Sequence, residues 1–392
     1  MELQARLQQL LSYLDADPDN ISLIADAVDI YLQIGPLLKA HTLLSQGLDV
    51  KADDTRLLFQ RSTLHMAEAQ YEPAKDILQS LLQSGVENTG IRYNLALCLS
   101  MTGEMQEALD ILTEPDKQPI QHFFAGDLLI VRLKHHAGDL DEALSLAMTL
   151  LKKEPDNGDL NGVISLLFLD LDDRAQALHF AQKAQQNTPN NTESLSTVGH
   201  LALEDFDANK AKGSFEKILD IQPKDGRAWL GMGLAALLNQ EMDIGEEHLV
   251  TATTFMPNHL GTWNTLAWLR ILKKNIPGAK EALNAAMEKD RTFSENHGTL
   301  AVVQILENQR EDAERSIKIA LRLDPMCISA HFAQTLLLSP EKDQNTISER
   351  MENLMNRPIG EGQSMLKGLQ RYASKSNNIK GNNIKSNDKK LH

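Results

Sequence analysis

Several short stretches of the sequence carry residues that could do chemistry, and each lacks something that the chemistry needs. The stretch "GMGLAA", residues 231–236, matches the G-x-G-x-x-A pattern that holds the pyrophosphate of a dinucleotide. That pattern needs a preceding strand and a turn, whereas we expect these glycines inside a helix. The sequence therefore predicts no bound cofactor.

Acidic and histidine residues offer two weak candidates for metal sites. His135 and His136 are neighbours, so an α-helix would point them about 100° apart. No second pair lies three or four residues away to complete a zinc site. The offsets of a calcium loop are met by Asp15, Asp17, Asp19 and Asp26, but Asn20 occupies the place that needs glycine. With no nucleophile elbow, phosphate loop or H-E-x-x-H pattern present, we expect no metal and no enzyme.

The composition favours an acidic, helical protein. Of 392 residues, 42% are hydrophobic and only 5% are aromatic, which favours helices over sheets. The net charge of −15 would repel phosphate backbones, so we expect no nucleic-acid partner. No apolar run reaches the roughly 18 to 20 residues that span a bilayer, and no signal peptide is apparent. These features, with the widely separated Cys98 and Cys327 as packing residues, predict a cytoplasmic protein.

A 34-residue period organises the chain. Pro155, Pro189, Pro223 and Pro257 are 34 residues apart, and Pro325 falls two periods later. Small residues recur with the same period, 12 positions before each proline position, and one residue is inserted after the third small residue. These small residues are Ala40, Ala74, Ala108, Ala143, Ala177, Ala211, Gly245, Ala279 and Ala313. The predicted repeats therefore begin at Ile21, Thr55, Thr89, Phe124, Gly158, Thr192, Gly226, Leu260, Ser294 and Ile328.

Each repeat is expected to fold as two antiparallel helices. The proline at position 32 ends the second helix. Gly35, Gly103 and Gly138 suit a left-handed turn between the two helices. The small residue at position 20 lets the paired helices approach closely. Position 34 supplies an N-cap for the next first helix in Asp54, Asn88, Asn157, Asn191 and Asp225.

On these residues the chain resembles tetratricopeptide repeat proteins. The likeness is clearest in "GDLDEALSLAMTLLKKEPDN" and "RAWLGMGLAAL", with Trp229 and Gly233 where that family often has them, and it covers about residues 21–338. Within that family, the chain resembles the bacterial cytoplasmic members that have no attached catalytic domain. The resemblance implies an all-α fold, a right-handed α-solenoid or superhelix of nine to ten helix pairs. It also implies an inner groove, lined mainly by the first helices, that binds peptides or protein segments.

The two ends and two internal departures complete the predicted organisation. We expect residues 1–20 to form an N-terminal capping helix, residues 21–338 the repeat array and residues 339–373 C-terminal capping helices. Residues 374–392 carry five Lys and one Asp and are expected to form a disordered basic tail. Arg291 takes one proline position, and the insertion within residues 113–123 is expected to bend the stacking.

The first helices share a set of positions that we call the inner face, namely repeat positions 5, 9 and 12. By the resemblance, this face lines the groove. It is mixed in the N-terminal half and mostly apolar in the C-terminal half. Trp268 is the best single candidate, since Trp229 and Trp263 hold the family's packing position. The predicted partner-binding residues are Leu230, Leu234, Leu237, Asn264, Trp268, Ile271, Val302, Ile305, Phe332, Arg132 and His135.

The sequence leaves three uses of these apolar residues open. They could be core of a tightly wound superhelix, a groove for an apolar segment of a partner, or a surface for self-association. Some relatives grip a C-terminal carboxylate with groove Lys, Arg and Asn residues, but Arg92, Asn94, Arg132 and His135 match that clamp incompletely. We therefore predict a non-catalytic adaptor or assembly factor that binds a protein or peptide segment. The alternative is a self-assembling scaffold.

Overall fold

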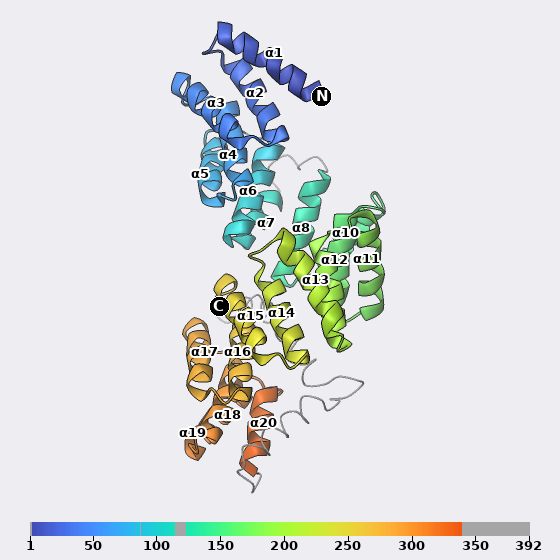
Figure 1. Ribbon diagram of the computed structural model, residues 1–392, viewed down its shortest axis with the longest axis vertical. Coiled ribbons are helices and arrows are strands. Elements are labelled where there is room, and N and C mark those ends of the chain that lie inside the picture. The colour runs from blue at the N-terminus through green and yellow to red at the C-terminus, as the bar shows by residue number, and fades with distance from the viewer. Residues whose placement is uncertain (1, 87, 114–122, 339–392) are drawn as a thin grey trace, which may run out of the picture. The chain divides into compact units, whose positions relative to one another are not determined.

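The computed structural model describes residues 2–86, 88–113 and 123–338, and every regular element in these ranges is an α-helix (Figure 1). The predicted C-terminal capping helices, the predicted basic tail and the predicted bend at the insertion lie outside the described residues, except for Thr113 and Phe123. The chain divides into two compact units, an N-terminal unit of residues Met1–Leu146 and a C-terminal unit of residues Ala147–His392.

The helices follow the predicted repeats. A leading helix, α1, spans Glu2–Ala16. The first helices of the repeats are α2 (Ile21–Ile34), α4 (Thr55–Ala67), α6 (Thr89–Thr102), α8 (Phe124–Ala137), α10 (Gly158–Asp170), α12 (Thr192–Glu204), α14 (Gly226–Leu238), α16 (Leu260–Leu272), α18 (Ser294–Leu306) and α20 (Ile328–Leu338). The second helices are α3 (Leu37–Val50), α5 (Tyr71–Gln83), α7 (Met105–Thr113), α9 (Leu140–Leu151), α11 (Arg174–Asn187), α13 (Ala208–Ile221), α15 (Met242–Phe255), α17 (Ile276–Lys289) and α19 (Arg310–Leu323). Every first helix begins at the predicted residue, so the predicted all-α architecture of helix pairs is confirmed.

Side-chain caps explain where the first helices begin. All five predicted N-caps accept a backbone N–H of the following turn; Asp225, for example, accepts from Ala228 at 2.9 Å. Two further caps were not predicted. Asn20 accepts from Leu23 at 3.1 Å, and the ring Nδ1 of His259 accepts from Thr262 at 3.2 Å.

The turns between paired helices place repeat position 15 in the left-handed region. Gly35, Gly103 and Gly138 have φ of 95°, 94° and 84°, as predicted. The other turns reach the same conformation without glycine, with φ between 57° and 67°, at Ala69, Asp172, Phe206, Gln240, Lys274 and Asn308. The geometry of the repeat therefore imposes this backbone conformation whatever residue occupies it.

Each helix pair is closely packed because small residues lie between its helices. The nine residues at position 20 are all buried. In α14, a Cβ on Gly233 would lie 2.8 Å from the Leu249 side chain, and one on Gly231 would lie 2.4 Å from the Phe215 ring. These two glycines are therefore required by packing inside a helix.

A repeated hydrogen bond ties the first helices to the preceding junction. In several repeats, the side chain at position 4 bonds through a nitrogen to the backbone carbonyl of position 32 in the repeat before it. Trp229 donates to Pro223 at 2.9 Å, and Trp263 donates to Pro257 at 2.9 Å. The same contact joins Asn161 to Pro155, His297 to Arg291 and His331 to Pro325. The bond needs only a carbonyl, so Arg291 replaces proline without losing it.

The hydrophobic core runs along the stacked helices of each unit. In the N-terminal unit, Leu7, Leu10 and Leu14 of α1 join a buried cluster with α2, α3 and α4. In the C-terminal unit, one cluster continues from Leu195 on α12 to Leu336 on α20. Among the described residues, no helix combines the length and the apolar character needed to cross a membrane.

Candidate binding face

The residues first considered for chemistry take structural roles. "GMGLAA" lies within α14, as expected, with its glycines against Phe215 and Leu249. Asp26 accepts from Arg56 at 2.6 Å, and Asp17 accepts from Asn20 at 2.9 Å, so two of the four candidate calcium ligands bond to other side chains.

The two cysteines are buried packing residues, as predicted. Burial raises the pKa of the Cys98 thiol to about 11 and also raises the pKa of Cys327. A thiol with a raised pKa carries little thiolate at neutral pH, so neither cysteine is an activated nucleophile.

The inner face of repeats 7–10, in the C-terminal unit, is mostly buried within the chain itself. Leu230 and Leu234 on α14 are each 6% exposed, and Val302 on α18 is fully buried. Of the predicted binding residues in this unit, only Leu237 and Ile305 are partly exposed; Leu230, Leu234, Asn264, Trp268, Ile271, Val302 and Phe332 are buried. The structure thus places these side chains in the core cluster, and their contact with a partner stays a prediction.

Trp268 differs from the other two tryptophans. Its ring packs against Phe332 of α20, with the ring centroids 5.7 Å apart. Its Nε1 is buried and finds no hydrogen-bond acceptor among the described residues, whereas Trp229 and Trp263 both donate to a carbonyl. A buried N–H without an acceptor costs about 1 to 3 kcal/mol, so packing must hold this ring in place.

Polar side chains join the last three first helices beside Trp268. Asn264 on α16 donates to Asn296 at 3.2 Å and to Thr299 at 3.0 Å, both on α18. Thr299 then donates to Ser329 of α20 at 3.2 Å. The amide of Asn264, a predicted binding residue, is therefore used to connect α16 with α18.

The start of α20 is capped by a residue of the preceding repeat. Glu295 on α18 is 1% exposed, and its two carboxylate oxygens accept the backbone N–H groups of Ile328 at 2.8 Å and Ser329 at 3.1 Å. A carboxylate at a helix N-terminus is favoured by both hydrogen bonding and the helix dipole. This contact fixes α20 against α18, where a Cβ on Gly298 would lie 2.6 Å from the backbone nitrogen of Ala330.

The inner face of repeats 2–4, in the N-terminal unit, is much more accessible. Only Leu128 is buried there. Tyr93 lies edge-on to Phe123, with ring centroids 5.3 Å apart, and Met101 beside the face is 55% exposed. The remaining members are all partly exposed: Phe59, Thr63, Met66, Tyr93, Leu97, Ser100, Arg132 and His135. Of the predicted binding residues, the structure thus leaves Arg132 and His135 on an open part of the face.

The structure adds little support for the hypothesis of a carboxylate clamp. Arg92 is 6% exposed, so its guanidinium is largely withdrawn from solvent. Asn94, Arg132 and His135 are partly exposed. These residues therefore still match the carboxylate clamp of the family only incompletely.

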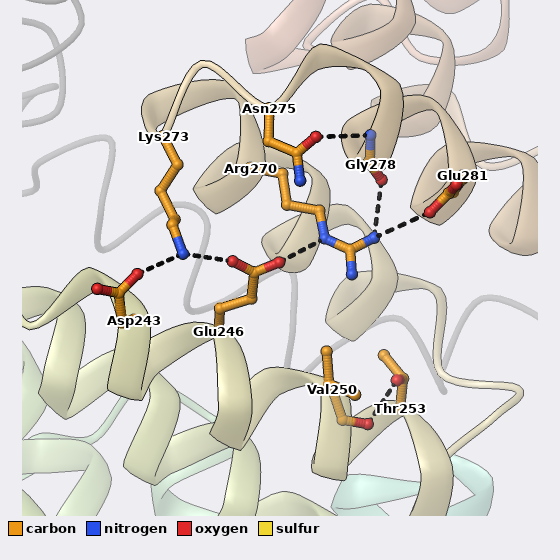
Figure 2. Close-up of polar contacts among 9 residues, drawn as sticks. All are labelled: Asp243, Glu246, Val250, Thr253, Arg270, Lys273, Asn275, Gly278 and Glu281. Atoms are coloured by element: carbon orange, nitrogen blue, oxygen red, sulfur yellow. Dashed lines mark hydrogen bonds and ion pairs between the residues drawn. The ribbon is translucent and has the colours of Figure 1, made fainter.

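An ion-pair network fixes the joint between repeats 7 and 8 (Figure 2). Glu246 on α15 accepts from Arg270 at 2.8 Å and from Lys273 at 2.6 Å, both on α16. Lys273 also reaches Asp243 at 2.6 Å, and Arg270 donates to the carbonyl of Gly278 at 2.8 Å. The Lys273 hydrogen bond, with help from Arg270, holds the pKa of the Glu246 carboxyl below its usual value, against the opposing effect of burial.

Equivalent positions carry related ion pairs elsewhere. Glu246 and Lys273 occupy positions 21 and 14 of consecutive repeats, and Lys280 and Glu307 occupy the same two positions with the charges exchanged, 2.5 Å apart. In the N-terminal unit, Lys75 at position 21 pairs at 2.7 Å with Glu104, which lies at position 16 of the next repeat instead of position 14. The sequence analysis did not predict these pairs.

Comparison with known proteins supports the fold. No family model matches the chain. The structure of a human IFIT1 dimer with m7Gppp-AAAA has a TM-score of 0.56 at 13% identity, covering 98% of this chain and 94% of that one. At this identity the likeness concerns the fold alone. The 34-residue helix pairs give the chain the fold of tetratricopeptide repeat proteins.

Other known proteins are also similar to this chain. BBSome complex member BBS4 of Bos taurus is 19% identical over 293 residues, or 73% of this chain. This chain spans about half, 56%, of the length of that relative. A tetratricopeptide repeat protein from Parabacteroides merdae has a TM-score of 0.44 at 16% identity, covering 73% of this chain and 99% of that one.

Proposed function

We propose that this protein is a non-catalytic adaptor or assembly factor that binds a segment of another protein on the inner face of repeats 2–4. The observation that carries the proposal is the accessibility of apolar side chains on successive first helices. Phe59 and Met66 lie on α4, and Tyr93 and Leu97 lie on α6, all partly exposed. Aromatic and methionine side chains that remain accessible are typical of protein-binding surfaces.

The chemistry of this face suits an apolar segment with some polar character. Thr63 and Ser100 offer hydroxyl groups beside the apolar side chains, and Arg132 adds a guanidinium from α8. These groups could bond backbone carbonyls of a bound segment while its side chains contact Phe59 and Leu97. The proposed location is the cytoplasm, because two buried, unpaired cysteines fit a reducing compartment.

The test compares partner capture from the native cell by wild-type protein and by a Phe59→Ala/Leu97→Ala variant. We expect specific partners to be lost or weakened about tenfold, since contacts of this kind contribute about 1 to 2 kcal/mol. Leu38→Ala is the matched control, because Leu38 is 83% exposed on α3, outside the inner face. Equal capture by all three proteins would contradict the proposal.

Light scattering distinguishes the proposed adaptor from the alternative, a self-assembling scaffold. A wild-type protein that stays monomeric over a wide concentration range supports the adaptor. Concentration-dependent association that Phe59→Ala/Leu97→Ala removes would assign the same face to contacts between copies of the chain.

A further inference from the structure

The second helix of repeat 7, α15, exposes more large apolar side chains than any other described second helix. Ile244, Val250 and Phe255 are 46%, 41% and 38% exposed. The helix contains no Lys or Arg. These side chains point away from the core of their own repeat and are not part of the inner face, so they form a separate surface of the C-terminal unit.

Two of these side chains belong to a continuous stripe along α15. The members of the stripe are spaced by four, three and four residues, so they lie on one side of the helix over about 16 Å. The neighbouring helix α14 widens the stripe with Trp229, which is partly exposed and lies with its ring 5.3 Å from that of His248. We call these five residues the outer patch: Trp229, Ile244, His248, Thr251 and Phe255.

The outer patch is uncharged, unlike the same positions in the neighbouring repeats. The stripe occupies repeat positions 19, 23, 26 and 30. In α11, α13, α17 and α19 these positions include at least one charged residue, namely Lys183, Lys210, Lys217, Lys289 and Asp312. Burial lowers the pKa of His248, the only titratable residue of the patch. Its imidazole is therefore neutral at pH 7.

Carboxylates predominate around the outer patch. Glu247, Glu216 and Glu241 lie close enough to His248 to favour its protonation, and Lys212 is the one cation that opposes them. Lys212 pairs with Glu216 at 3.8 Å. The other two carboxylates, on exposed residues, form no ion pair with another described residue. Three carboxylates and one ammonium give this border a net charge of −2.

We propose that the outer patch binds an amphipathic helix of another protein, one whose apolar side is flanked by Lys or Arg residues. A straight stripe of about 16 Å matches a helix with apolar residues at i, i+4 and i+7. Aromatic side chains such as Trp229 and Phe255 are enriched in the centres of protein interfaces. Basic flanks on the partner would complement the carboxylates of Glu241 and Glu247.

A second copy of this chain fits the outer patch less well than a basic partner does. Pairing two patches would bring Glu241 and Glu247 of one copy close to the same carboxylates of the other, and like charges in an interface are unfavourable. The inference does not depend on the function proposed for the inner face of repeats 2–4, because that face lies in the N-terminal unit.

Titration of the full-length protein with a synthetic peptide tests the apolar contact. The probe is a dye-labelled helical peptide of about 18 residues with Leu on one side and Lys on both flanks, followed by fluorescence anisotropy. We expect Ile244→Ala/Phe255→Ala to weaken its binding about tenfold. Leu323→Ala is the matched control and should leave the affinity unchanged. Leu323 has the position of Phe255 in α19 and is 39% exposed, but its repeat has His297 in place of Trp229.

Charge changes on the protein and on the peptide test the basic flanks. Glu247→Lys alters only an exposed side chain and should weaken binding of the Lys-flanked peptide several-fold at low salt, and less at high salt. The same peptide with Glu in place of Lys should bind the wild-type protein at least several-fold more weakly. Circular dichroism melts check that every variant is folded.

Three results would overturn the proposal. The first is equal affinity of the wild type and Ile244→Ala/Phe255→Ala for the Lys-flanked peptide. The second is equal affinity of the wild type for the Lys-flanked and Glu-flanked peptides. The third is concentration-dependent association of the wild type, measured by light scattering, that Ile244→Ala/Phe255→Ala removes. This last result would assign the outer patch to a second copy of the chain.

Discussion

The inner face is accessible in repeats 2–4 and mostly buried in repeats 7–10, although the same repeat positions form it. Phe59 and Leu97 in the N-terminal unit stay partly exposed, whereas Leu234 and Trp268 in the C-terminal unit are 6% exposed. The register fixes which way a side chain points from its helix. Whether solvent reaches it depends on which other side chains pack over it.

Small residues and polar bonds explain the close approach of α18 and α20 in the C-terminal unit. Gly298 lets the backbone of α20 lie directly against α18, and Glu295 caps α20 from that neighbour. Trp268 then fills the space beside Phe332. The difference teaches that an apolar stripe on a repeat helix is a binding surface only where the adjacent helices leave it uncovered.

The largest expected effect is a difference in folding stability between variants in the buried part and variants in the accessible part of the inner face. Trp268→Ala and Leu234→Ala should each cost about 2 to 5 kcal/mol, because truncating a buried side chain leaves a cavity. Leu97→Ala should cost about 1 kcal/mol or less, since Leu97 is already partly exposed. Urea unfolding followed by circular dichroism measures all three. A loss for Leu97→Ala as large as that for Trp268→Ala would break the comparison.

A smaller effect tests the close packing of the C-terminal unit through its glycines. Gly231→Ala should destabilise by about 1 to 3 kcal/mol, because the added Cβ would lie 2.4 Å from the Phe215 ring. Gly213→Ala, on α13, is the control, since no atom lies within 4 Å of its Cβ position. This control should be neutral or more stable by up to about 1 kcal/mol through helix propensity. The same unfolding measurement decides whether the two variants differ in sign.

The repeat register could be predicted because several independent residues specify it. Prolines, N-caps and small residues recur together, so the starts of the first helices followed from the sequence. Burial could not be predicted in the same way. The apolar run from Leu230 to Leu237 fits both an open groove and a core, and only packing against other helices of the same core cluster, outside that run, distinguishes them.

Two further features lacked a local signal. The left-handed turns at Phe206 and Gln240 carry residue types that do not favour positive φ, so only their repeat position indicates the conformation. The pairing of Glu246 with Arg270 and Lys273 joins residues more than 20 positions apart, and charged residues are too common for that distance to be read from one sequence.

A pH-dependent effect tests the joint between repeats 7 and 8. The folded pKa of Glu246 lies below its usual value of 4.5, so its ion pairs stabilise the protein above that value and are lost as the pH falls through the lower, folded pKa. Glu246→Gln should therefore cost about 1 kcal/mol at pH 7, the upper range for a partly exposed pair. The difference from wild type should shrink below about pH 4.5. A difference that stays constant from pH 7 to pH 3 would contradict an ionic contribution.

The smallest expected effect concerns the turns, in which the two units differ again. The N-terminal unit has glycine at three of its left-handed turns, Gly35, Gly103 and Gly138, whereas Asp172, Phe206, Gln240, Lys274 and Asn308 hold the turns of the C-terminal unit. Gln240→Gly should relieve left-handed strain, but the greater freedom of glycine in the unfolded chain partly offsets this effect. We therefore expect the folding stability to rise by about 0.5 kcal/mol.

Two further variants extend the comparison of the turns. Asn308→Gly should change stability by less, because asparagine tolerates the left-handed region better than glutamine does. The reverse change in the N-terminal unit, Gly103→Ala, should cost about 1 kcal/mol. Thermal melts of the three variants would refute the strain argument if Gln240→Gly proved less stable than wild type while Gly103→Ala had no effect.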